Sequence, residues 1–409
     1  AGYNYGITTE AFAHTTFEVP AADLPAGEYT NVVGNQTIAW GLIAGAQAAG
    51  LPLFYASYPI TPASDVLHEL ARHKNFGVRT FQAEDEIAAV GLALGASFVG
   101  HLGVTGTSGP GVALKSETIS LALMAELPLV IVNVQRGGPS TGLPTKTEQS
   151  DLMMAIHGRH GDAPLPVVAA SGPGDAFDTA IEACRIAIKY MTPVLLLSDG
   201  YIGTSSEPWL LPDLATLPSF PAAMASEINH DDVFMPYLRN PETLARPWAV
   251  PGTPGLEHRG GGLEKDQLTG NVSYDPLNHE TMIMLREQKV EAVVNDIPDI
   301  EVGEDADADL LVIGWGSTFP ATRAGVKNTR LKGHKVAHVH LRHLHPFAKN
   351  LSEVLARYPK VLVPELNRGQ LSRLLRAEYL TPAISFSKVQ GLPFTAAEME
   401  AKIIETLEA

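Results

Sequence analysis

The chain has 409 residues, of which 45% are hydrophobic and 18% are charged, as expected for a globular protein of two or three domains. Its formal net charge of −16 at pH 7 disfavours nucleic acid and anionic membrane surfaces as partners, because both are negatively charged. No apolar run reaches the roughly 18 residues of a membrane span, and the single cysteine, Cys184, cannot by itself hold an iron–sulfur cluster. We therefore expect a cytoplasmic protein.

The first segment, residues 1–30, shows no clear hydrophobic period and contains Pro20, Pro25 and several glycines. This composition predicts a linker or an arm. The chain opens with AGYNYGITTE, without a methionine, so we expect further residues upstream of Ala1.

A first α/β domain is predicted over residues 31–212. A helix of small residues runs from about Asn35 to Ala49, and a strand at residues 53–56 leads into the sequence YPITP. The two prolines of this sequence restrict the backbone on either side of Thr61. A stiff turn at the carboxyl end of a strand would thus hold the Thr61 hydroxyl in place.

The stretch of residues 81–111 carries the most distinctive pattern of the chain. Glu84, Asp85 and Glu86 precede a helix of small residues, which lets a ligand or a neighbouring backbone come close. A short strand at residues 101–105 leads into the turn GTSGPG, which opens another helix and can direct free N–H groups at a polar ligand. The sequence therefore predicts a carboxylate and a polar cradle on adjacent elements of one sheet.

The apolar run LPLVIVNV is typical of a parallel strand that is buried on both faces. It ends in QRGGPSTG, where Arg136 is suited to hold a carboxylate through two parallel hydrogen bonds. A helix at residues 176–190 and a strand at residues 193–197 complete the domain. Cys184 lies on the apolar side of that helix and is predicted to be a small buried side chain.

Residues 213–298 are predicted to be an irregular arm followed by a linker helix. The arm is rich in proline and glycine, and a segment this long without regular elements usually serves as a functional loop or an interface. We predict a dimer contact there, so that deleting about residues 251–270 would dissociate the assembly. The helix at about residues 279–294 carries apolar residues on one side, for packing.

A second α/β domain with a parallel sheet is predicted over residues 299–409, where strands and helices alternate again. Its histidines are His334, His338, His340, His343 and His345. Few carboxylates and no cysteine lie near them in the sequence, which argues against a metal site. Gly314-Trp315-Gly316 lacks the third glycine of a dinucleotide fingerprint, and Lys115-Ser116 has the wrong spacing for a Walker loop.

Four ordered motifs, YPITP, AEDEIAAVGLALGAS, TGTSGPG and QRGGPSTGLPTKTEQSDL, resemble the α subunits of 2-oxoacid:ferredoxin oxidoreductases. The last motif is most similar to the 2-oxoglutarate branch (2-oxoglutarate synthase), and PELNRGQL resembles the second domain of the family. The resemblance covers about residues 34–390. It implies the pyrimidine-binding, transketolase-like domain of a thiamine diphosphate enzyme, followed by a domain like the C-terminal domain of transketolases.

The resemblance also implies partners. In that family a β subunit holds the diphosphate and Mg²⁺ of thiamine diphosphate and carries a [4Fe–4S] cluster, ferredoxin accepts the electrons and coenzyme A accepts the acyl group. A γ domain lies upstream or in a separate chain. We accordingly expect CoA-dependent oxidative decarboxylation of 2-oxoglutarate by a dimer of heterodimers, reversible as CO₂ fixation in a reductive tricarboxylic acid cycle.

Site residues follow from the matching positions of the motifs. Glu86 would be the catalytic carboxylate that hydrogen-bonds N1′ of the aminopyrimidine, with Glu84 as the alternative. Substrate binding is assigned to Thr61, Arg136, Ser140 and Thr141, and binding of the pyrimidine side of the cofactor to Tyr58, Ile60, Glu86, Ser108 and Gly109. Lys146 or a histidine is a candidate for the distal carboxylate of the substrate. No metal ligand is assigned to this chain.

Other interpretations remain open. Ser198-Asp199-Gly200 with Asn229 imitates the metal-binding segment of thiamine enzymes only loosely, because its first glycine is missing, and we interpret it as a coincidence. The substrate could instead be pyruvate or a branched-chain 2-oxoacid. The chain could also be a non-catalytic structural partner, or a nucleotide-binding oxidoreductase.

Overall fold

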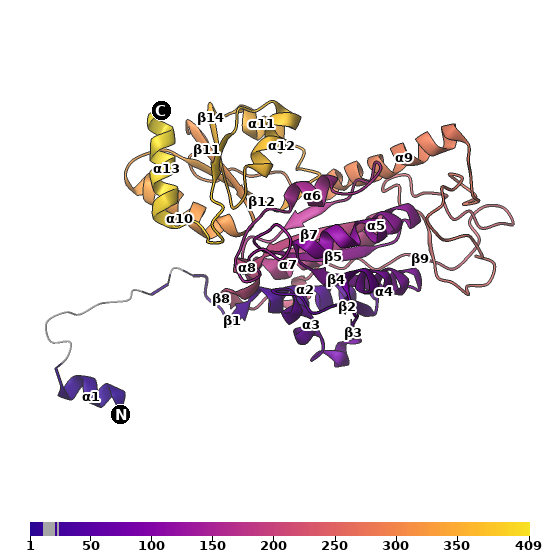
Figure 1. Ribbon diagram of the computed structural model, residues 1–409, viewed down its shortest axis with the longest axis horizontal. Helices are drawn as coiled ribbons and strands as arrows, with labels where there is room; N and C mark the ends of the chain where they lie inside the picture. The colour runs from indigo at the N-terminus through magenta and orange to yellow at the C-terminus, as the bar shows by residue number, and fades with distance from the viewer. Residues whose placement is uncertain (11–20, 23) are drawn as a thin grey trace.

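A computed structural model describes residues 1–10, 21–22 and 24–409, and Figure 1 shows two α/β units joined by a long helix and an irregular arm. The first unit has a seven-stranded sheet of order β13-β6-β7-β5-β4-β2-β3, parallel except at the β13–β6 pair. Its strands are β2 (Leu53–Ser57), β3 (Arg79–Gln82), β4 (Leu102–Thr107), β5 (Leu129–Gln135), β6 (Val167–Ala169), β7 (Pro193–Asp199) and β13 (His343–His345). Its helices are α2 (Gly34–Ala49), α3 (Ser64–Leu70), η1 (Lys74–Phe76), α4 (Glu86–Phe98), α5 (Gly109–Ala125), α6 (Leu152–His157), α7 (Asp175–Tyr190) and α8 (Gly200–Thr204).

The second unit has a four-stranded parallel sheet of order β12-β11-β14-β15. Its strands are β11 (Leu310–Trp315), β12 (Ala337–Leu341), β14 (Lys360–Glu365) and β15 (Ile384–Ser387). Its helices are η4 (Gly316–Thr318), α10 (Phe319–Leu331), α11 (Leu351–Ala356), α12 (Gln370–Tyr379) and α13 (Ala396–Glu408). The predicted fold class, two α/β domains with parallel sheets, is confirmed.

The small residues of α2 have a packing role. A Cβ atom on Gly41 would lie 2.3 Å from the Phe177 carbonyl oxygen, and one on Gly45 would lie 2.8 Å from the Cys184 sulfur. Glycine at these positions therefore lets α2 pack directly on α7. Cys184 is fully buried in this contact, as predicted, and burial raises the pKa of its thiol to about 12.

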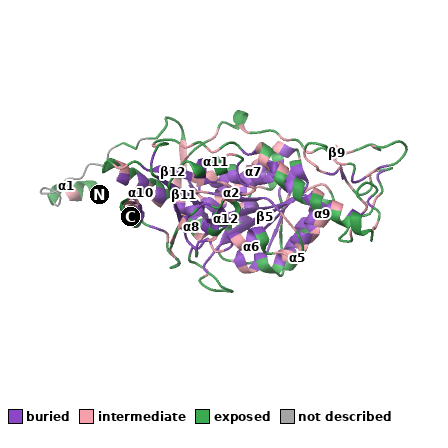
Figure 2. Cartoon of the chain, turned by 90° about the horizontal axis from the view of Figure 1, so that it is seen from above, coloured by how far each residue is buried: buried purple, intermediate pink, exposed green. Residues whose placement is uncertain are grey.

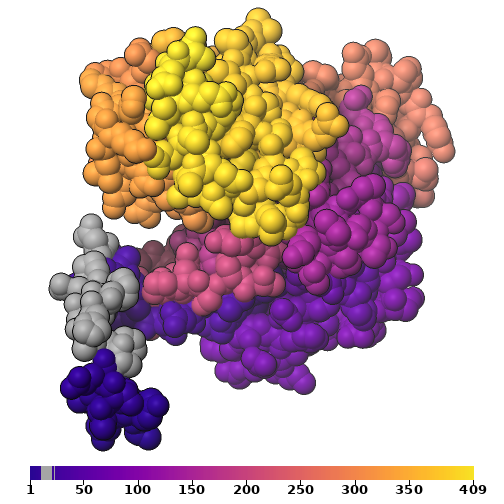
Figure 3. Space-filling view, turned by 60° about the vertical axis from the view of Figure 1, so that its left-hand side comes forward, coloured from indigo at the N-terminus to yellow at the C-terminus, as the bar shows by residue number. Residues whose placement is uncertain are grey.

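The two units share one core. The largest cluster of buried apolar side chains contains residues of both sheets, such as Leu195 on β7 and Leu311 on β11. Figure 2 shows buried residues running continuously along the strands, and Figure 3 shows the second unit seated directly on the first. The strand β13 comes from the second unit in sequence but pairs with β6, so residues 343–345 belong to the first sheet.

The N-terminal segment contains more regular structure than a linker would. The helix α1 (Gly2–Thr8) buries none of its residues, and β1 (Tyr29–Val33) pairs antiparallel with β8 (Ser206–Leu210). Residues 11–20 and 23 of this segment lie outside the described residues.

Among the helices that the structure describes, none is both long and apolar enough to span a lipid bilayer.

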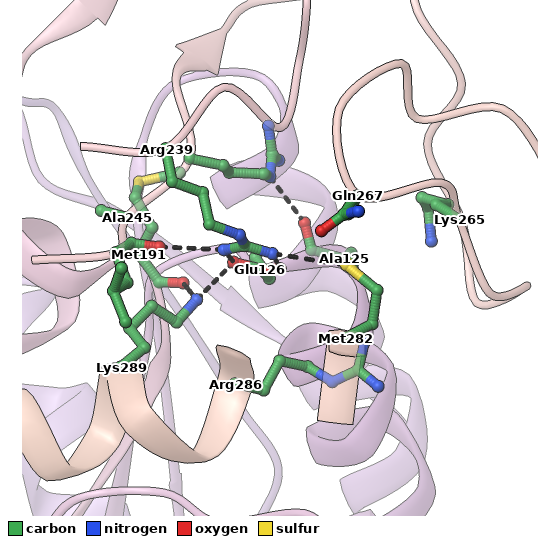
Figure 4. A network of polar contacts seen from close by, with 12 residues as sticks. Ala125, Glu126, Met191, Arg239, Ala245, Lys265, Gln267, Met282, Arg286 and Lys289 are labelled. Carbon is green, nitrogen blue, oxygen red and sulfur yellow. Dashed lines mark hydrogen bonds and ion pairs between the residues drawn. The ribbon is translucent and has the colours of Figure 1, made fainter. Parts of the chain in front are cut away.

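The arm has only the short elements η2 (Leu214–Thr216), β9 (Met224–Ala225) and β10 (Trp248–Ala249), and it leads into α9 (Pro276–Glu291) and η3 (Ala292–Asp296). Buried charges fasten it to the first unit, as Figure 4 shows. Glu126, at the end of α5, binds Arg239 of the arm and Lys289 of α9, with closest N···O distances of 2.5 Å in both pairs. Arg246 donates to the carbonyl of Ala125 at 3.0 Å.

Candidate active site

The candidate site lies at the carboxyl edge of the seven-stranded sheet. β2, β4 and β5 are parallel neighbours, so the segments that follow them emerge on the same side. These segments contain every predicted substrate- and cofactor-binding residue except Glu86, which follows the adjacent edge strand β3. Ligands of open α/β sheets bind at this edge.

Tyr58 and the turn after β4 meet in a buried part of the edge. The Tyr58 hydroxyl oxygen lies 3.1 Å from Thr107 Oγ1, and the side chain is almost fully buried. A Cβ atom on Gly111 would lie 2.2 Å from the Tyr58 oxygen, so glycine is required where α5 begins. Tyr58 also packs with Ala89 of α4, and Ile60 is partly buried against the same small cluster.

Glu86 is the first residue of α4. Asp85 caps this helix, because its Oδ1 accepts a hydrogen bond of 2.8 Å from the backbone N–H of Ala88. The side chain of Glu86 is partly exposed, and no side-chain hydrogen bond joins it to the described part of the chain. Glu84 is exposed and precedes the cap. Glu86 thus has a fixed backbone and a carboxylate that is available to a ligand.

Arg136 and Thr61 come together although 75 residues separate them. Arg136 Nη1 donates to the Thr61 carbonyl oxygen at 2.7 Å, and the guanidinium is nearly buried. The Nε atom of Arg136 is buried and has no partner in the described chain. The structure therefore supports Arg136 through the Thr61 backbone and leaves donors for a carboxylate ligand.

Ser140 and Thr141 occupy the tip of the loop after β5. Gly137 closes this loop, since its N–H donates to the Lys146 carbonyl at 2.9 Å and its carbonyl accepts from Leu143 at 2.8 Å. Both Ser140 and Thr141 are exposed, as is Lys146. The structure does not join them to Arg136 by hydrogen bonds within the described chain.

Ser108 and Gly109 lie beside a carboxyl group that the sequence analysis did not single out. Ser108 Oγ is buried and has no hydrogen-bond partner among the residues that the structure describes. A Cβ atom on Gly109 would lie 2.8 Å from Asp151 Oδ2, and this oxygen accepts a hydrogen bond of 3.0 Å from Asn133. Burial raises the pKa of Asp151 to about 6, although the bond from Asn133 opposes this shift.

Two polar side chains within the buried strand β5 position this acid. Asn133 binds the Asp151 carboxylate, and Gln135 Oε1 accepts a hydrogen bond of 3.1 Å from the Asp151 backbone N–H. Both side chains are buried, at 0% and 1% exposure. The sequence signal for this arrangement was present, because Asn and Gln interrupt an otherwise apolar strand and buried polar groups require partners.

The motifs TEQSDL and PELNRGQL bind each other at the contact between the two units. Gln149 donates to the Trp315 carbonyl at 2.8 Å and accepts from the Leu366 N–H at 3.0 Å. Gln370 donates to the Ser150 carbonyl at 2.7 Å and accepts from the Met153 N–H at 2.8 Å. The second unit therefore holds the segment that follows the Arg136 loop.

The residues that imitate a thiamine-type metal segment are engaged separately. Asp199 caps α8 by accepting from the N–H groups of Tyr201 and Ile202, whereas Asn229 binds the backbone of Met235 in the arm. This supports the interpretation of that pattern as a coincidence.

Three of the histidines in residues 334–345 have separate hydrogen-bond partners. His340 pairs with the Gly316 carbonyl at 3.0 Å, His343 with Glu182 at 2.9 Å and His345 with the Leu165 carbonyl at 2.8 Å. Within residues 1–10, 21–22 and 24–409, no group of three or more His, Cys, Asp or Glu side chains has the arrangement of a metal site.

Comparison with known proteins agrees with the motifs. The family described as "Pyruvate flavodoxin/ferredoxin oxidoreductase, thiamine diP-bdg" matches residues 45–273. The 2-oxoglutarate oxidoreductase subunit KorA of Mycobacterium tuberculosis is 55% identical over 98% of this chain and 60% of that protein. The 2-oxoglutarate synthase subunit KorA of Methanocaldococcus jannaschii is 33% identical over 83% of this chain and 88% of that protein.

Solved structures show the same relationship. A 2-oxoglutarate:ferredoxin oxidoreductase from Magnetococcus marinus, with 2-oxoglutarate, coenzyme A and succinyl-CoA bound, superposes with a TM-score of 0.90 at 36% identity. The superposition covers 99% of this chain and 70% of that one. A split-gene transketolase shares the fold, with a TM-score of 0.54 at 13% identity over 92% of this chain and 98% of that one.

This chain is shorter than several of its relatives, since it spans 60%, 57% and 64% of three of the curated proteins that it matches. The family match nevertheless covers more than half of the chain, and the archaeal relative is covered almost completely. The predicted resemblance is confirmed. The chain therefore belongs to the 2-oxoacid:ferredoxin oxidoreductase family, as a relative of its α subunits.

Proposed function

We propose that this chain is the α subunit of a thiamine-diphosphate-dependent 2-oxoglutarate:ferredoxin oxidoreductase. The reaction converts 2-oxoglutarate, CoA and two oxidised ferredoxins into succinyl-CoA, CO₂, two reduced ferredoxins and a proton, and its reversal fixes CO₂. The observation that carries the proposal is the identity of 55% to a 2-oxoglutarate oxidoreductase subunit over nearly the whole chain.

The carboxyl edge of the first sheet fits the pyrimidine side of the cofactor. Ser108 Oγ is a buried polar atom without a partner in the described part of the chain, and Gly111 allows the close approach of Tyr58 to the start of α5. When bound, thiamine diphosphate would supply a nucleophilic thiazolium carbon and a ring that serves as an electron sink for decarboxylation. Residues Tyr58, Ile60, Ser108 and Gly109 would hold the aminopyrimidine ring, while Glu86 would hold a proton at N1′.

Substrate recognition is proposed at the loop after β5. The Arg136 guanidinium, fixed by the Thr61 carbonyl, would bind the 1-carboxylate through two hydrogen bonds. Thr61, Ser140 and Thr141 would line the same pocket, and Lys146 is a cation available for the distal carboxylate. Because Ser140, Thr141 and Lys146 are exposed in this chain, we expect a partner subunit to cover them.

The remaining parts of the enzyme would lie in partners. A β subunit would bind the diphosphate and Mg²⁺ and carry the [4Fe–4S] cluster that passes electrons to ferredoxin. A γ domain would lie upstream of residue 1 or in a separate chain. The complex would be a cytoplasmic dimer of heterodimers.

The experiment is CoA-dependent reduction of a viologen dye under anoxic conditions by the complex of this chain with its β subunit. We expect turnover with 2-oxoglutarate to exceed turnover with pyruvate or branched-chain 2-oxoacids. Glu86→Gln should lower kcat by at least about a hundredfold, because general acid–base contributions are of that size. Glu84→Gln is the matched control and should retain most of the activity.

The outcomes separate the alternatives. A preference for pyruvate or a branched-chain substrate would move the chain to another branch of the family. Full turnover in Glu86→Gln together with its loss in Glu84→Gln would move the catalytic role to Glu84, and full turnover in both variants would favour a non-catalytic structural role. Tight binding of NAD(P) by this chain alone would favour a nucleotide-dependent oxidoreductase.

A further inference from the structure

A buried lysine lies directly behind the proposed catalytic glutamate. Lys115 belongs to the second turn of α5, and its side chain is fully buried. Its Nζ atom donates to the backbone carbonyl of Glu86 at 2.8 Å and to Thr105 Oγ1 on β4 at 3.0 Å. The same atom lies 5.3 Å from the centre of the Tyr58 ring, within the range of a cation–π contact.

The burial of this lysine has a cost that packing alone does not explain. Moving an ammonium group into a protein interior costs several kcal/mol unless a carboxylate compensates it. Within the described residues no carboxylate oxygen lies in ion-pair contact with Lys115 Nζ. A methionine would fill a similar volume without that cost, so the ammonium group needs a role of its own.

Its contacts join three parts of the candidate site. Through Nζ, Lys115 connects the first residue of α4 to β4 and to the face of the Tyr58 ring. Lys115 donates no hydrogen bond to the Glu86 carboxylate. It therefore acts on Glu86 through the backbone carbonyl that it binds.

We propose that Lys115 is a positioning residue of the thiamine site, which holds the first turn of α4 against β4 so that Glu86 meets the aminopyrimidine. This inference rests on the proposed function and extends it to a residue that the motifs did not mark.

The charge of Lys115 changes near neutral pH. Burial lowers its pKa to about 7, and the carboxylates of Glu86 and Asp85 offset only part of this shift. The titratable groups that face Lys115 are Glu86 at the start of α4, its N-cap residue Asp85, and the Tyr58 ring after β2. Below about pH 7 the ammonium form predominates, and above it the neutral amine does. We therefore expect the affinity for thiamine diphosphate to change in a step near pH 7.

The test compares Lys115→Met, Lys115→Arg and the wild-type chain, each in complex with the β subunit. Lys327→Met is the matched control, because Lys327 is exposed on α10 of the second unit. Three quantities are measured: amide hydrogen exchange at residues 86–90 without cofactor, the Kd of thiamine diphosphate from pH 6 to 8.5, and kcat and KM for 2-oxoglutarate. The mass of each complex verifies assembly.

In Lys115→Met we expect faster exchange at residues 86–90, a Kd about tenfold higher at pH 6 and no step near pH 7, since both hydrogen bonds of the ammonium group are lost. The value of kcat should fall while KM for 2-oxoglutarate stays unchanged. Lys115→Arg keeps the charge at every pH and should bind tightly without a step. The control should match the wild type.

Other results would overturn the inference. If Lys115→Met matches Lys327→Met in exchange, affinity and pH profile while the wild-type complex turns over 2-oxoglutarate, Lys115 is not a positioning residue. If Lys115→Met fails to assemble, Thr105→Val takes its place, because it removes one of the two acceptors of Lys115 Nζ. Wild-type exchange at residues 86–90 and wild-type affinity in that variant would then reject the inference. A wild-type complex that binds no thiamine diphosphate and turns over no 2-oxoacid would instead reject the proposed function, and this inference with it.

Discussion

Gly111 shows how the absence of a side chain permits a close contact at the candidate site. Its backbone lies so close to Tyr58 and Thr107 that a Cβ atom would come within 2.2 Å of the first side-chain oxygen and 2.1 Å of the second. Both oxygens belong to side chains held in the buried edge of the sheet, so neither can move away easily. The start of α5, including Ser108 and Gly109, depends on this close approach.

We predict that Gly111→Ala weakens thiamine diphosphate binding by at least about tenfold, because overpacking of this kind costs about 1–3 kcal/mol and displaces the turn. Isothermal titration of the complex with the β subunit measures the change. Gly303→Ala is the control, since no atom lies within 4 Å of its added Cβ. Equal affinities in the two variants would show that the turn adapts.

At the scale of elements, α5, α9 and the arm meet at a buried network of charges (Figure 4). Burial alone would raise the pKa of Glu126, but the charges of Lys289 and Arg239 outweigh it and hold the pKa well below its usual range. Lys289 also donates to the Met191 carbonyl, and Arg246 to the Ala125 carbonyl, so the cations stabilise the C-terminal ends of α7 and α5.

We predict that Glu126→Gln lowers the free energy of unfolding by about 3–5 kcal/mol at pH 7, because it leaves buried cations unpaired. A depressed pKa in the folded state gives stability that is present above the unfolded-state pKa of about 4.3 and is lost as pH falls below it. The difference between wild type and variant should therefore shrink below about pH 4.

Urea unfolding at pH 7, 5 and 3 measures that difference. Glu287→Gln, an exposed position on the same helix α9, is the control and should match the wild type throughout. A difference that stays constant down to pH 3 would contradict the assigned role of the Glu126 charge.

For the whole molecule, the two units behave as one body because they share apolar and polar contacts. Leu195 and Leu311 lie in one buried cluster, and Gln149 and Gln370 connect the motifs of the two units by hydrogen bonds. The arm packs on this body through Trp248 and extends along the ends of α4 and α5 (Figure 1), where a Cβ atom on Gly262 would lie 3.1 Å from Leu121.

The dimer contact of the arm stays a prediction. Deleting residues 251–270 should halve the mass of the assembly measured by light scattering, because the exposed apolar side chains Leu263 and Leu268 would be lost from the contact. The deletion also removes Glu264, which pairs with Arg286 at 3.1 Å. Glu264→Ala is therefore the control for the lost ion pair. An unchanged mass in the deletion variant would refute the contact.

The regular elements were predictable because their signals are local. The helix of small residues expected from Asn35 to Ala49 is α2 (Gly34–Ala49), and the apolar run after Leu127 is β5, buried along its whole length. By contrast, β13 and the β1–β8 pair were missed, since each depends on a partner far away in the sequence. Short strands of this kind have too few residues for a distinctive period.

The sequence by itself determined the α/β class, the family and the order of the motifs, because strand and helix periods and the motif spacings are written along the chain. Only the tertiary structure decided which groups meet: Arg136 with the Thr61 carbonyl, Asp151 with the turn at Gly109, and Lys115 with the backbone of Glu86. The physical reason is that these contacts join loops and helices that follow different strands of one parallel sheet. Their geometry depends on strand order and register, which no local pattern contains.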